Sequence, residues 1–273
     1  MVKPHEASVY NTLGKKTAPT LSSLLARDRL ASWVRSLETY LAFIQGKGSG
    51  SGWDIEAEAC LAVQHVRRSD PVVFDVGAGR GDWSASFLKI LGTPARLFLF
   101  EPLPSYQEVL RSRDLPGATL IPAAAGDRSQ PGVLHAPRSG FPIASLYLRR
   151  DSYFRTEEFY QEAVEVITLD DVIEDYGFDY VDFAKIDVEG HELAVLHGAS
   201  RALESRKIKA IAFEFGSGNI NSRSYFHDLW DVLCPSGYHV WRICPGGVLL
   251  PVREYYEDLE YFRGVSNYLA TVR

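Results

Sequence analysis

The stretch VVFDVGAGRGDWS, residues 72–84, decides the fold class of this chain. A short apolar run leads into glycines at positions 77, 79 and 81, and a helical pattern follows in GDWSASFLKIL. Glycines let the backbone turn tightly and approach a ligand closely, and the N-terminus of the helix offers unpaired N–H groups. The stretch therefore predicts a strand, a turn and a helix that together hold a polar cofactor.

Apolar, strand-like runs recur from residue 71 to the C-terminus. They are VVFDV, RLFLFE, ATLIPAAA, DFAKIDV, KAIAFEF, YHVWRIC and NYLATVR. Most are separated by helical patterns, and they are too apolar to leave one face of a sheet in water. This is typical of a mostly parallel sheet covered by helices on both sides. We therefore predict an α/β fold with a Rossmann-like, doubly wound sheet over residues 71–273.

Residues 1–70 differ from the rest of the chain. In LSSLLARDRLASWVRSLETYLAFI, apolar residues recur three to four positions apart, which predicts an amphipathic helix that ends at Gly46. The run GKGSGSG at 46–52 is flexible by composition and precedes a second helix around DIEAEACLAVQHVRR. We predict an N-terminal helical extension that closes over the ligand site as a lid, with its hinge at 46–52.

Composition excludes several classes of function. The chain has 273 residues, 46% of them hydrophobic, and a formal net charge of −6, which argues against binding to nucleic acid or to an anionic membrane. Its three cysteines, Cys60, Cys234 and Cys244, lack CxxC spacing and indicate reduced thiols rather than a metal site. The N-terminus has no apolar core of a signal peptide, and no run approaches the roughly 18 apolar residues of a spanning helix. We expect a soluble, cytoplasmic protein.

The cofactor is expected to contain a ribose. Glu101 stands twenty residues beyond Gly81 at the end of LFLFE, where its carboxylate could accept hydrogen bonds from both ribose hydroxyls. The dinucleotide fingerprint GxGxxG needs a third glycine where this chain has Asp82, which counts against NAD. Asp75 instead resembles the acidic residue of motif I in class I methyltransferases, which helps hold the amino group of S-adenosylmethionine (SAM).

A wider resemblance supports SAM. In order, FDVGAGRG, LFEPLPSYQEVL, IPAAAGD, VITLDDVIEDYG, DFAKIDVEGHELAVLHGA and IKAIAFEFG resemble the FkbM family of SAM-dependent methyltransferases over residues 71–216. The pieces TLDD and KIDVEGHE are the specific part. The resemblance implies a sheet of seven strands with the last one antiparallel, and O-methylation of a hydroxyl on a sugar or natural-product scaffold. A nicotinamide-dependent oxidoreductase and a catalytically silent nucleotide-binding module remain the alternatives.

The resemblance also implies a set of cofactor-binding residues. The methionine part of SAM would lie against Asp75, Gly77, Ala78, Gly79 and Gly81. Glu101 and Pro102 would contact the ribose, and Ala124, Ala125 and Asp127 the adenine. Asp127 could equally be a turn residue in GDRSQPG.

The segment AKIDVEGHEL, residues 184–193, crowds ionisable side chains at the end of a strand. Asp187 should border both cofactor and acceptor, because ligands bind at the carboxyl ends of such strands. The candidates for a general base are Asp187, Glu189, His191 and Glu214. His191 is attractive because an unperturbed histidine has a pKa near 6.5. Asp187 and Glu214 could instead share a Mg²⁺ ion, and Glu189 could simply interact with a helix dipole.

Two aromatic, charged stretches, RRDSYFRTEEFYQE at 149–162 and REYYEDLEYFRG at 253–264, lack an obvious core role. We predict that Tyr153, Phe154, Tyr255 and Tyr256 stack on a small-molecule acceptor that carries a hydroxyl. The alternative is the packing of amphipathic helices. A homo-oligomer is possible.

Overall fold

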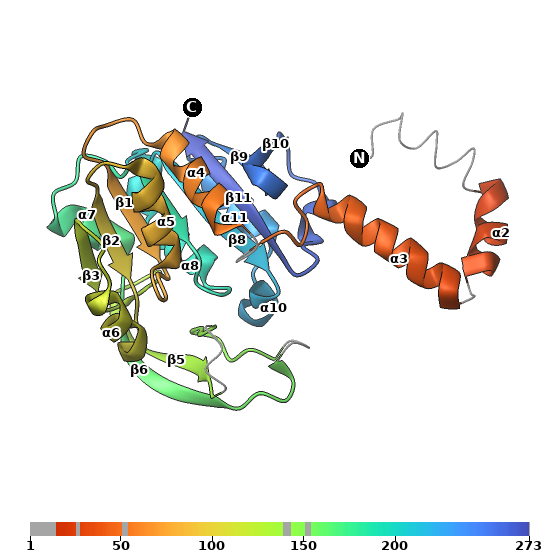
Figure 1. Cartoon of the computed structure of the whole chain (residues 1–273), viewed down its shortest axis with the longest axis horizontal. Coiled ribbons are helices and arrows are strands. Elements are labelled where there is room, and N and C mark those ends of the chain that lie inside the picture. The colour runs from red at the N-terminus through yellow and green to blue at the C-terminus, as the bar shows by residue number, and fades with distance from the viewer. Residues whose placement is uncertain (1–14, 26–27, 51–53, 139–142, 151–153, 273) are drawn as a thin grey trace. The chain divides into compact units, whose positions relative to one another are not determined.

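The computed structural model describes residues 15–25, 28–50, 54–138, 143–150 and 154–272. The chain divides into two units, Met1–Ile44 and Gln45–Arg273, and Figure 1 labels the elements of both. Within the described residues, no helix is both long and apolar enough to cross a lipid bilayer.

The smaller unit contains two described helices, α2 (Lys15–Leu25) and α3 (Asp28–Phe43). The amphipathic pattern that predicted one helix up to Gly46 is therefore divided between two, and residues 26–27 lie outside the described part.

The larger unit is built on a sheet of eight strands in the order β10-β9-β11-β8-β7-β1-β2-β3. The strands are β1 (Val72–Val76), β2 (Arg96–Phe100), β3 (Ala118–Ile121), β7 (Phe183–Ile186), β8 (Ala210–Gly216), β9 (Tyr238–Cys244), β10 (Val248–Val252) and β11 (Val265–Val272). The neighbours from β3 to β8 are parallel, and β11 is antiparallel to both β8 and β9.

All seven predicted strand positions are confirmed, and so is the antiparallel last strand. The prediction of seven strands is short by one, because β10 pairs with β9 as an eighth strand at the edge of the sheet. Its sequence VLLPV contains Pro251. Proline is disfavoured in a central strand, because it cannot donate a hydrogen bond to the ladder, but it is tolerated at an edge.

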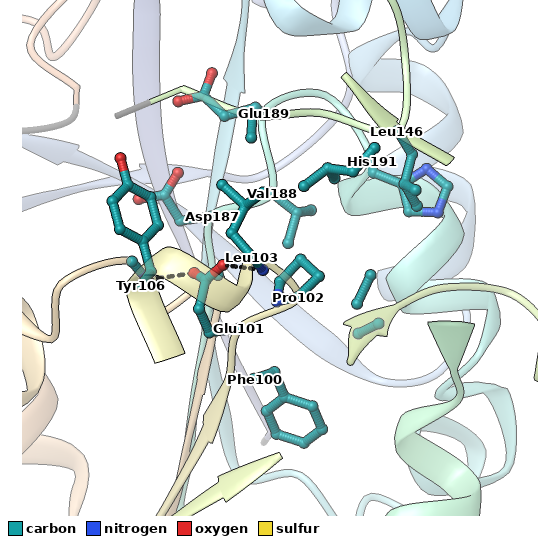
Figure 2. Close-up of a pocket in the computed structure, with 16 residues that line it drawn as sticks. Phe100, Glu101, Pro102, Leu103, Tyr106, Leu146, Asp187, Val188, Glu189 and His191 are labelled. Atoms are coloured by element: carbon teal, nitrogen blue, oxygen red, sulfur yellow. Dashed lines mark hydrogen bonds between the residues drawn. The ribbon is translucent and has the colours of Figure 1, made fainter. Parts of the chain in front are cut away.

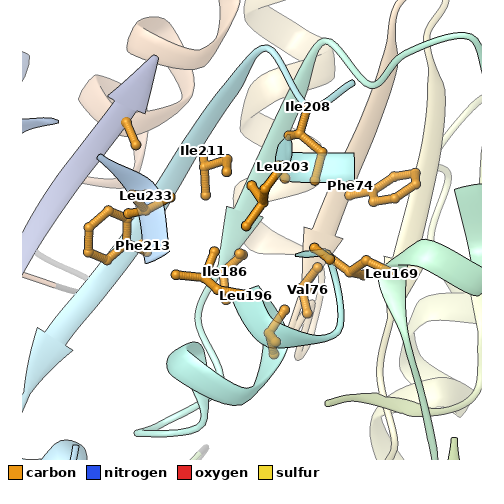
Figure 3. Close-up of a cluster of buried hydrophobic side chains, with 14 of the residues drawn as sticks. Phe74, Val76, Leu169, Ile186, Leu196, Leu203, Ile208, Ile211, Phe213 and Leu233 are labelled. Atoms are coloured by element: carbon orange, nitrogen blue, oxygen red, sulfur yellow. The ribbon is translucent and has the colours of Figure 1, made fainter. Parts of the chain in front are cut away.

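Helices cover both faces of the sheet, as predicted for a doubly wound fold. On one face, Val73 of β1 packs with buried residues of α4 (Ile55–His65) and α5 (Asp82–Leu91). On the other face, Phe74 and Val76 pack with α7 (Leu169–Asp175), α8 (Glu192–His197), α9 (Ser200–Glu204) and α11 (Phe226–Leu233), and Figure 3 shows part of this cluster. Burying one such side chain stabilises the fold by about 1.5–3 kcal/mol.

The motif TLDD ties two of these helices together. Thr168 Oγ1 accepts a hydrogen bond from Asp171 N at 3.0 Å and so caps α7. The carboxylate of Asp170 accepts from Arg201 N at 2.8 Å and Ala202 N at 2.9 Å, at the start of α9. This family-specific motif therefore has a structural role, which is to join α7 to α9.

The glycine run at 46–50 lies against β11 and the segment before it. Gly50 N donates to Val265 O at 2.9 Å, and Lys47 forms an ion pair with Asp258. A Cβ atom on Gly48, which has φ of +73°, would lie 2.4 Å from Arg263 O. Because it has no side chain, Gly48 allows these two backbone segments to approach each other closely. Ser51 and Gly52, the rest of the predicted hinge, lie outside the described residues.

A second, three-stranded sheet projects from the larger unit (Figure 1). It consists of β4 (Ala124–Ala125), β6 (Phe159–Ile167) and β5 (Gln130–Pro137) in that order. The run ATLIPAAA, predicted as one strand, is divided at Pro122 between β3 and β4, because proline cannot donate to a strand ladder. Strands β5 and β6 were not predicted. The aromatic stretch 149–162 ends inside β6 and not in a helix.

Among the other helices of the larger unit, three follow or precede strands of the main sheet. Helix α6 (Pro104–Ser112) follows β2, α10 (Gly218–Ser222) follows β8, and the 3₁₀-helix η4 (Glu257–Glu260) precedes β11. Helix α4, which the sequence grouped with the N-terminal extension, buries Ala59, Leu61 and Ala62 in the core beside α5. The division between the two units lies between residues 44 and 45.

Candidate functional site

A pocket lies where the carboxyl ends of β1, β2 and β7 meet, the position at which open α/β sheets bind ligands. Its wall is formed by the glycine turn after β1, residues 100–103, Tyr106, and the loop after β7. The second sheet contributes Ala124, Ala125 and Leu134. Figure 2 shows Glu101, Tyr106 and Asp187 on one side of this pocket and His191 on the other.

The glycine turn is held against two neighbouring strands. Gly77 N and Ala78 N both donate to Phe100 O at 3.0 Å. Gly77 has φ of +84°, and a Cβ atom there would lie 1.9 Å from Asp187 O, so no other residue fits this position. Gly79 has open space where a Cβ atom would stand. The turn therefore leaves a free backbone surface facing the pocket.

Glu101 lies at the end of β2 with both carboxylate oxygens engaged. Oε2 accepts from Gly79 N and Oε1 accepts from Leu103 N, each at 2.8 Å, as the dashed lines in Figure 2 mark. Burial raises the pKa of Glu101 to about 7, although these two N–H groups oppose the shift. Each oxygen keeps a further lone pair, so Glu101 can still accept from two hydroxyls.

Not every predicted cofactor residue lines this pocket. Gly77, Gly79, Glu101, Pro102, Ala124, Ala125 and Asp187 do. Ala78 is buried beside α5, Gly81 precedes α5, and Asp127 is exposed and paired with Arg128 at 3.3 Å.

Asp75 lies behind the glycine turn and is fully buried. Its Oδ2 accepts from Ser84 Oγ, and its Oδ1 has no hydrogen-bond partner among the described residues. Burial raises the pKa of Asp75. The nearest cation is Lys185, whose Nζ lies 3.9 Å from Asp75 Oδ1 and 2.7 Å from Asp187 Oδ2. One lysine therefore links the motif I acid to the acid at the end of β7.

Glu189 also lines the pocket, and it is held by Arg149. The Nη1 atom of Arg149 lies 2.7 Å from Glu189 Oε2, and Nη2 donates to Ser217 Oγ at 3.1 Å. Burial and the nearby Asp187 raise the pKa of Glu189 to about 7, and Arg149 opposes this shift. Glu189 has φ of +54°, which is strained for a residue with a side chain.

His191 follows in the same loop, in an apolar setting. Its ring lies 5.3 Å from that of Tyr147, and its Nδ1 is buried without a hydrogen-bond partner among the described residues. Burial lowers the pKa of His191 to about 4, with Asp127 opposing the shift. The unperturbed pKa near 6.5 that made His191 attractive is therefore not the pKa that this site imposes.

Glu214 lies outside this pocket. It lines a smaller one on the far side of Asp187, together with Lys185, Glu58 and Asn267. Burial and the charge of Asp187 raise the pKa of Glu214. Within the described residues there is no group of three or more His, Cys, Asp or Glu side chains that could hold a metal ion. The hypothesis of a Mg²⁺ ion shared by Asp187 and Glu214 thus gains no support.

The predicted acceptor aromatics do not gather at this pocket. Tyr255 donates to Glu260 Oε1 at 2.9 Å, Tyr256 is exposed, and Phe154 packs against Phe159. Tyr153 lies outside the described residues.

Several residues that do line the pocket were missed from the sequence: Leu103, Tyr106, Leu134, Ala144 and Leu146. Leu103 and Tyr106 follow Glu101 by two and five residues, and this proximity to the predicted ribose ligand was the available signal. Leu134, Ala144 and Leu146 belong to β5 and the segment after it, for which no strand had been predicted.

Comparison with known proteins identifies the family of this chain. A family model described as the methyltransferase FkbM domain matches residues 75–240. The chain belongs to this family. The predicted resemblance is thereby confirmed, and the match extends beyond residue 216.

Individual relatives are more distant. The hexuronic acid methyltransferase AglP of Haloferax volcanii is 33% identical over 137 residues, which cover 50% of this chain and 53% of that protein. The chain thus matches about half the length of that relative. The structure of an FkbM methyltransferase from Methylobacillus flagellatus is 16% identical, with a TM-score of 0.46, and the match covers 88% of this chain and 60% of that one. A SAM-dependent O-methyltransferase from Thermotoga maritima is 15% identical, with a TM-score of 0.40 over 80% of this chain and 65% of that one.

Proposed function

We propose that this protein is a SAM-dependent O-methyltransferase that acts on a hydroxyl of a sugar or natural-product scaffold. The observation that carries the proposal is the charge of the pocket wall. Glu101, Asp187 and Glu189 line it, and no lysine or arginine stands among its described lining residues. The sulfonium of SAM is a cation, whereas the pyrophosphate of NAD(P) is an anion, so this wall favours SAM over a nicotinamide cofactor.

The residues of the pocket fit the parts of SAM. Glu101 accepts from the ribose hydroxyls with the lone pairs that Gly79 N and Leu103 N leave unused. Ala124 and Ala125 are small enough to admit a flat adenine ring against β4. The open space beside Gly79 receives the methionine part, and Asp187 borders it.

SAM supplies the methyl group, and the chain has to take the proton of the acceptor hydroxyl. Glu189 is our choice among the four candidates, because it lines the pocket and its pKa of about 7 suits a base at neutral pH. His191, with a pKa of about 4, is a much weaker base, and Glu214 lies outside the pocket. Asp187 then serves to position the ligands.

The acceptor is a small molecule with an uncharged surface at the reacting hydroxyl. AglP is named for a hexuronic acid, which supports a sugar as the class of acceptor. The described part of the wall offers no unpaired cation to a carboxylate of the acceptor, because Lys185 already pairs with Asp187 and Arg149 with Glu189. We therefore favour a neutral sugar, or the neutral face of a larger scaffold.

Titration calorimetry of the purified chain tests the proposal. We expect SAM and S-adenosylhomocysteine to bind in the micromolar range, and NADH and NADPH to show no saturable heat. Binding of NADH tighter than that of SAM would overturn the proposal in favour of an oxidoreductase. If neither SAM and S-adenosylhomocysteine nor NADH and NADPH bound, a catalytically silent nucleotide-binding module would be the better interpretation.

A further inference from the structure

The peptide bond between Glu189 and Gly190 is held at both of its polar atoms by side chains from two different parts of the larger unit. Its carbonyl oxygen, on Glu189, accepts a hydrogen bond from Ser145 Oγ at 2.9 Å. Its N–H group, on Gly190, donates to Glu192 Oε1 at 3.1 Å. Ser145 and Glu192 are both buried, so water has little access to these two hydrogen bonds. The orientation of this peptide plane is therefore fixed.

The backbone on either side of the peptide bond needs this support. Glu189 has φ of +54° and Gly190 has φ of +99°, so two consecutive residues lie in the left-handed region. Glycine adopts such angles freely, but a residue with a side chain does so at a cost in free energy. Without the two hydrogen bonds, Glu189 should relax to a negative φ, and its carboxylate should then leave its position on the pocket wall.

Ser145 connects the second sheet to this loop. Its backbone pairs with His135 of β5, because His135 N donates to Ser145 O at 2.8 Å and Ser145 N donates to His135 O at 3.1 Å. Its hydroxyl oxygen also accepts a hydrogen bond from Tyr147 N at 3.1 Å. A hydroxyl has one proton to donate, and that of Ser145 goes to Glu189 O.

The segment 143–150 contacts the pocket with some residues and the loop with others. Ala144 and Leu146 line the pocket, and Figure 2 shows Leu146 on its wall. Ser145 and Arg149 instead contact Glu189, Ser145 at the backbone and Arg149 at the carboxylate. Ser145 itself does not line the pocket, so it can affect a reaction there only through the residues that it holds.

We propose that Ser145 is a positioning residue, whose hydroxyl keeps the Glu189–Gly190 peptide in the orientation that presents the Glu189 carboxylate to the acceptor hydroxyl. This inference rests on the proposed function, in which Glu189 is the general base. Arg149 and Ser145 have complementary roles: Arg149 holds the carboxylate, and Ser145 holds the backbone from which the side chain extends.

Ser145→Ala removes the hydroxyl and keeps the backbone pairing with β5. With SAM and a panel of neutral methyl glycosides as acceptors, we expect kcat to fall about 10- to 100-fold, because a small misplacement of a reacting group has an effect of this size. The Kd of SAM and the KM of the acceptor should stay within about threefold, because Ser145 does not line the pocket. The control is Ser236→Ala, which should keep the wild-type kcat. The Ser236 hydroxyl also donates to a backbone carbonyl, Val232 O at 2.9 Å, but it lies just before β9, at the edge of the sheet opposite to the pocket.

Combination with Glu189→Gln separates positioning of the base from a general structural role. If Ser145 acts only through Glu189, adding Ser145→Ala to Glu189→Gln should lower the residual kcat by less than about threefold. A further loss of 10- to 100-fold in the double variant would overturn the proposal. So would a normal kcat in Ser145→Ala when Glu189→Gln is inactive, and this result would leave the proposed function intact. A normal kcat in Glu189→Gln would instead refute the choice of base, and the role of Ser145 with it.

Hydrogen exchange tests the same contact without turnover. The peptide that contains residues 188–191 should exchange its amide protons at least about 10-fold faster in Ser145→Ala and at the wild-type rate in Ser236→Ala. If the wild-type chain methylates none of the glycosides, the proposed acceptor is at fault, whereas unchanged exchange in Ser145→Ala would refute the positioning role itself. Should Ser145→Ala fail to accumulate, Ser145→Cys takes its place with the same expectations, because a thiol is only a weak donor.

Discussion

The guanidinium of Arg149 and the carboxylate of Glu189 form an ion pair with an N–O distance of 2.7 Å, and only 4% of the Arg149 side chain is exposed. The pair joins the segment between β5 and β6 to the loop after β7, so it connects the second sheet to the main one. It also holds Glu189 on the pocket wall despite the strained backbone of that residue. The position of the proposed base thus depends on an arginine from another part of the chain.

Glu189→Gln should lower kcat by roughly 100- to 10,000-fold, because the amide cannot take the hydroxyl proton. SAM affinity should stay nearly unchanged, since glutamine keeps the shape of the side chain. Single-turnover rates and calorimetric titration measure the two effects separately. The comparison variant is His191→Ala. If His191→Ala lost 100-fold or more while Glu189→Gln kept its activity, the role of base would pass to His191.

The pH profile should show the pKa of Glu189. The base acts when deprotonated, so kcat should rise with pH through about 7 and then level off. Arg149→Met removes the positive charge that opposes the raised pKa, and the rising limb should move to higher pH. The neighbouring Arg150→Met is the control, because Arg150 is exposed and its backbone N–H, which the substitution keeps, donates to Asn221 Oδ1. If the rising limb of the pH profile stayed at the same pH in Arg149→Met, Glu189 would not be the general base.

Glu101→Ala should weaken SAM binding by about 1.5–3 kcal/mol, roughly 10- to 150-fold in affinity, because hydrogen bonds to a charged group are lost. The variant also releases Gly79 N and Leu103 N, which Glu101 holds in place. Glu108→Ala on the exposed face of α6 is the control and should bind SAM like the wild type. Equal affinities of the two variants in calorimetry would remove Glu101 from the ribose site.

Lys185→Met should destabilise the fold by about 3–5 kcal/mol, because it leaves the fully buried carboxylate of Asp75 without its nearest cation. Urea unfolding at neutral pH measures the loss. The loss should shrink as the pH falls, because burial raises the folded-state pKa of Asp75 and protonation removes its buried charge. Lys89→Met is the control, because its pair with Glu56 spans 3.9 Å and both side chains are mostly exposed. Equal destabilisation by both variants would show that Lys185 does not stabilise Asp75.

Some residue patterns of this chain are compatible with more than one structural use. Glycines 46 to 50 looked flexible by composition, yet Gly48 and Gly50 lie close against residues 263–266, more than 200 positions away in sequence. Tyr255 and Tyr256 looked like an acceptor wall, yet Tyr255 packs with His227 and Glu260. The residues that meet Gly48 and Gly50, and the His227 ring that meets Tyr255, are distant in sequence, so composition alone could not reveal these contacts.

By itself, the sequence determined the main sheet, the helices that cover it and the glycine turn after β1. Apolar runs and helical periodicity are local properties of a sequence. A glycine turn such as the one at 77–81 can likewise be recognised from a few consecutive residues. Tertiary structure alone decided the chemistry of the charged loop. Arg149 pairs with Glu189 although the two residues are 40 positions apart in sequence. Burial raises the pKa of Glu189 and lowers the pKa of His191. The physical reason is that desolvation and pairing of charges depend on what lies nearby in space, which no local pattern records.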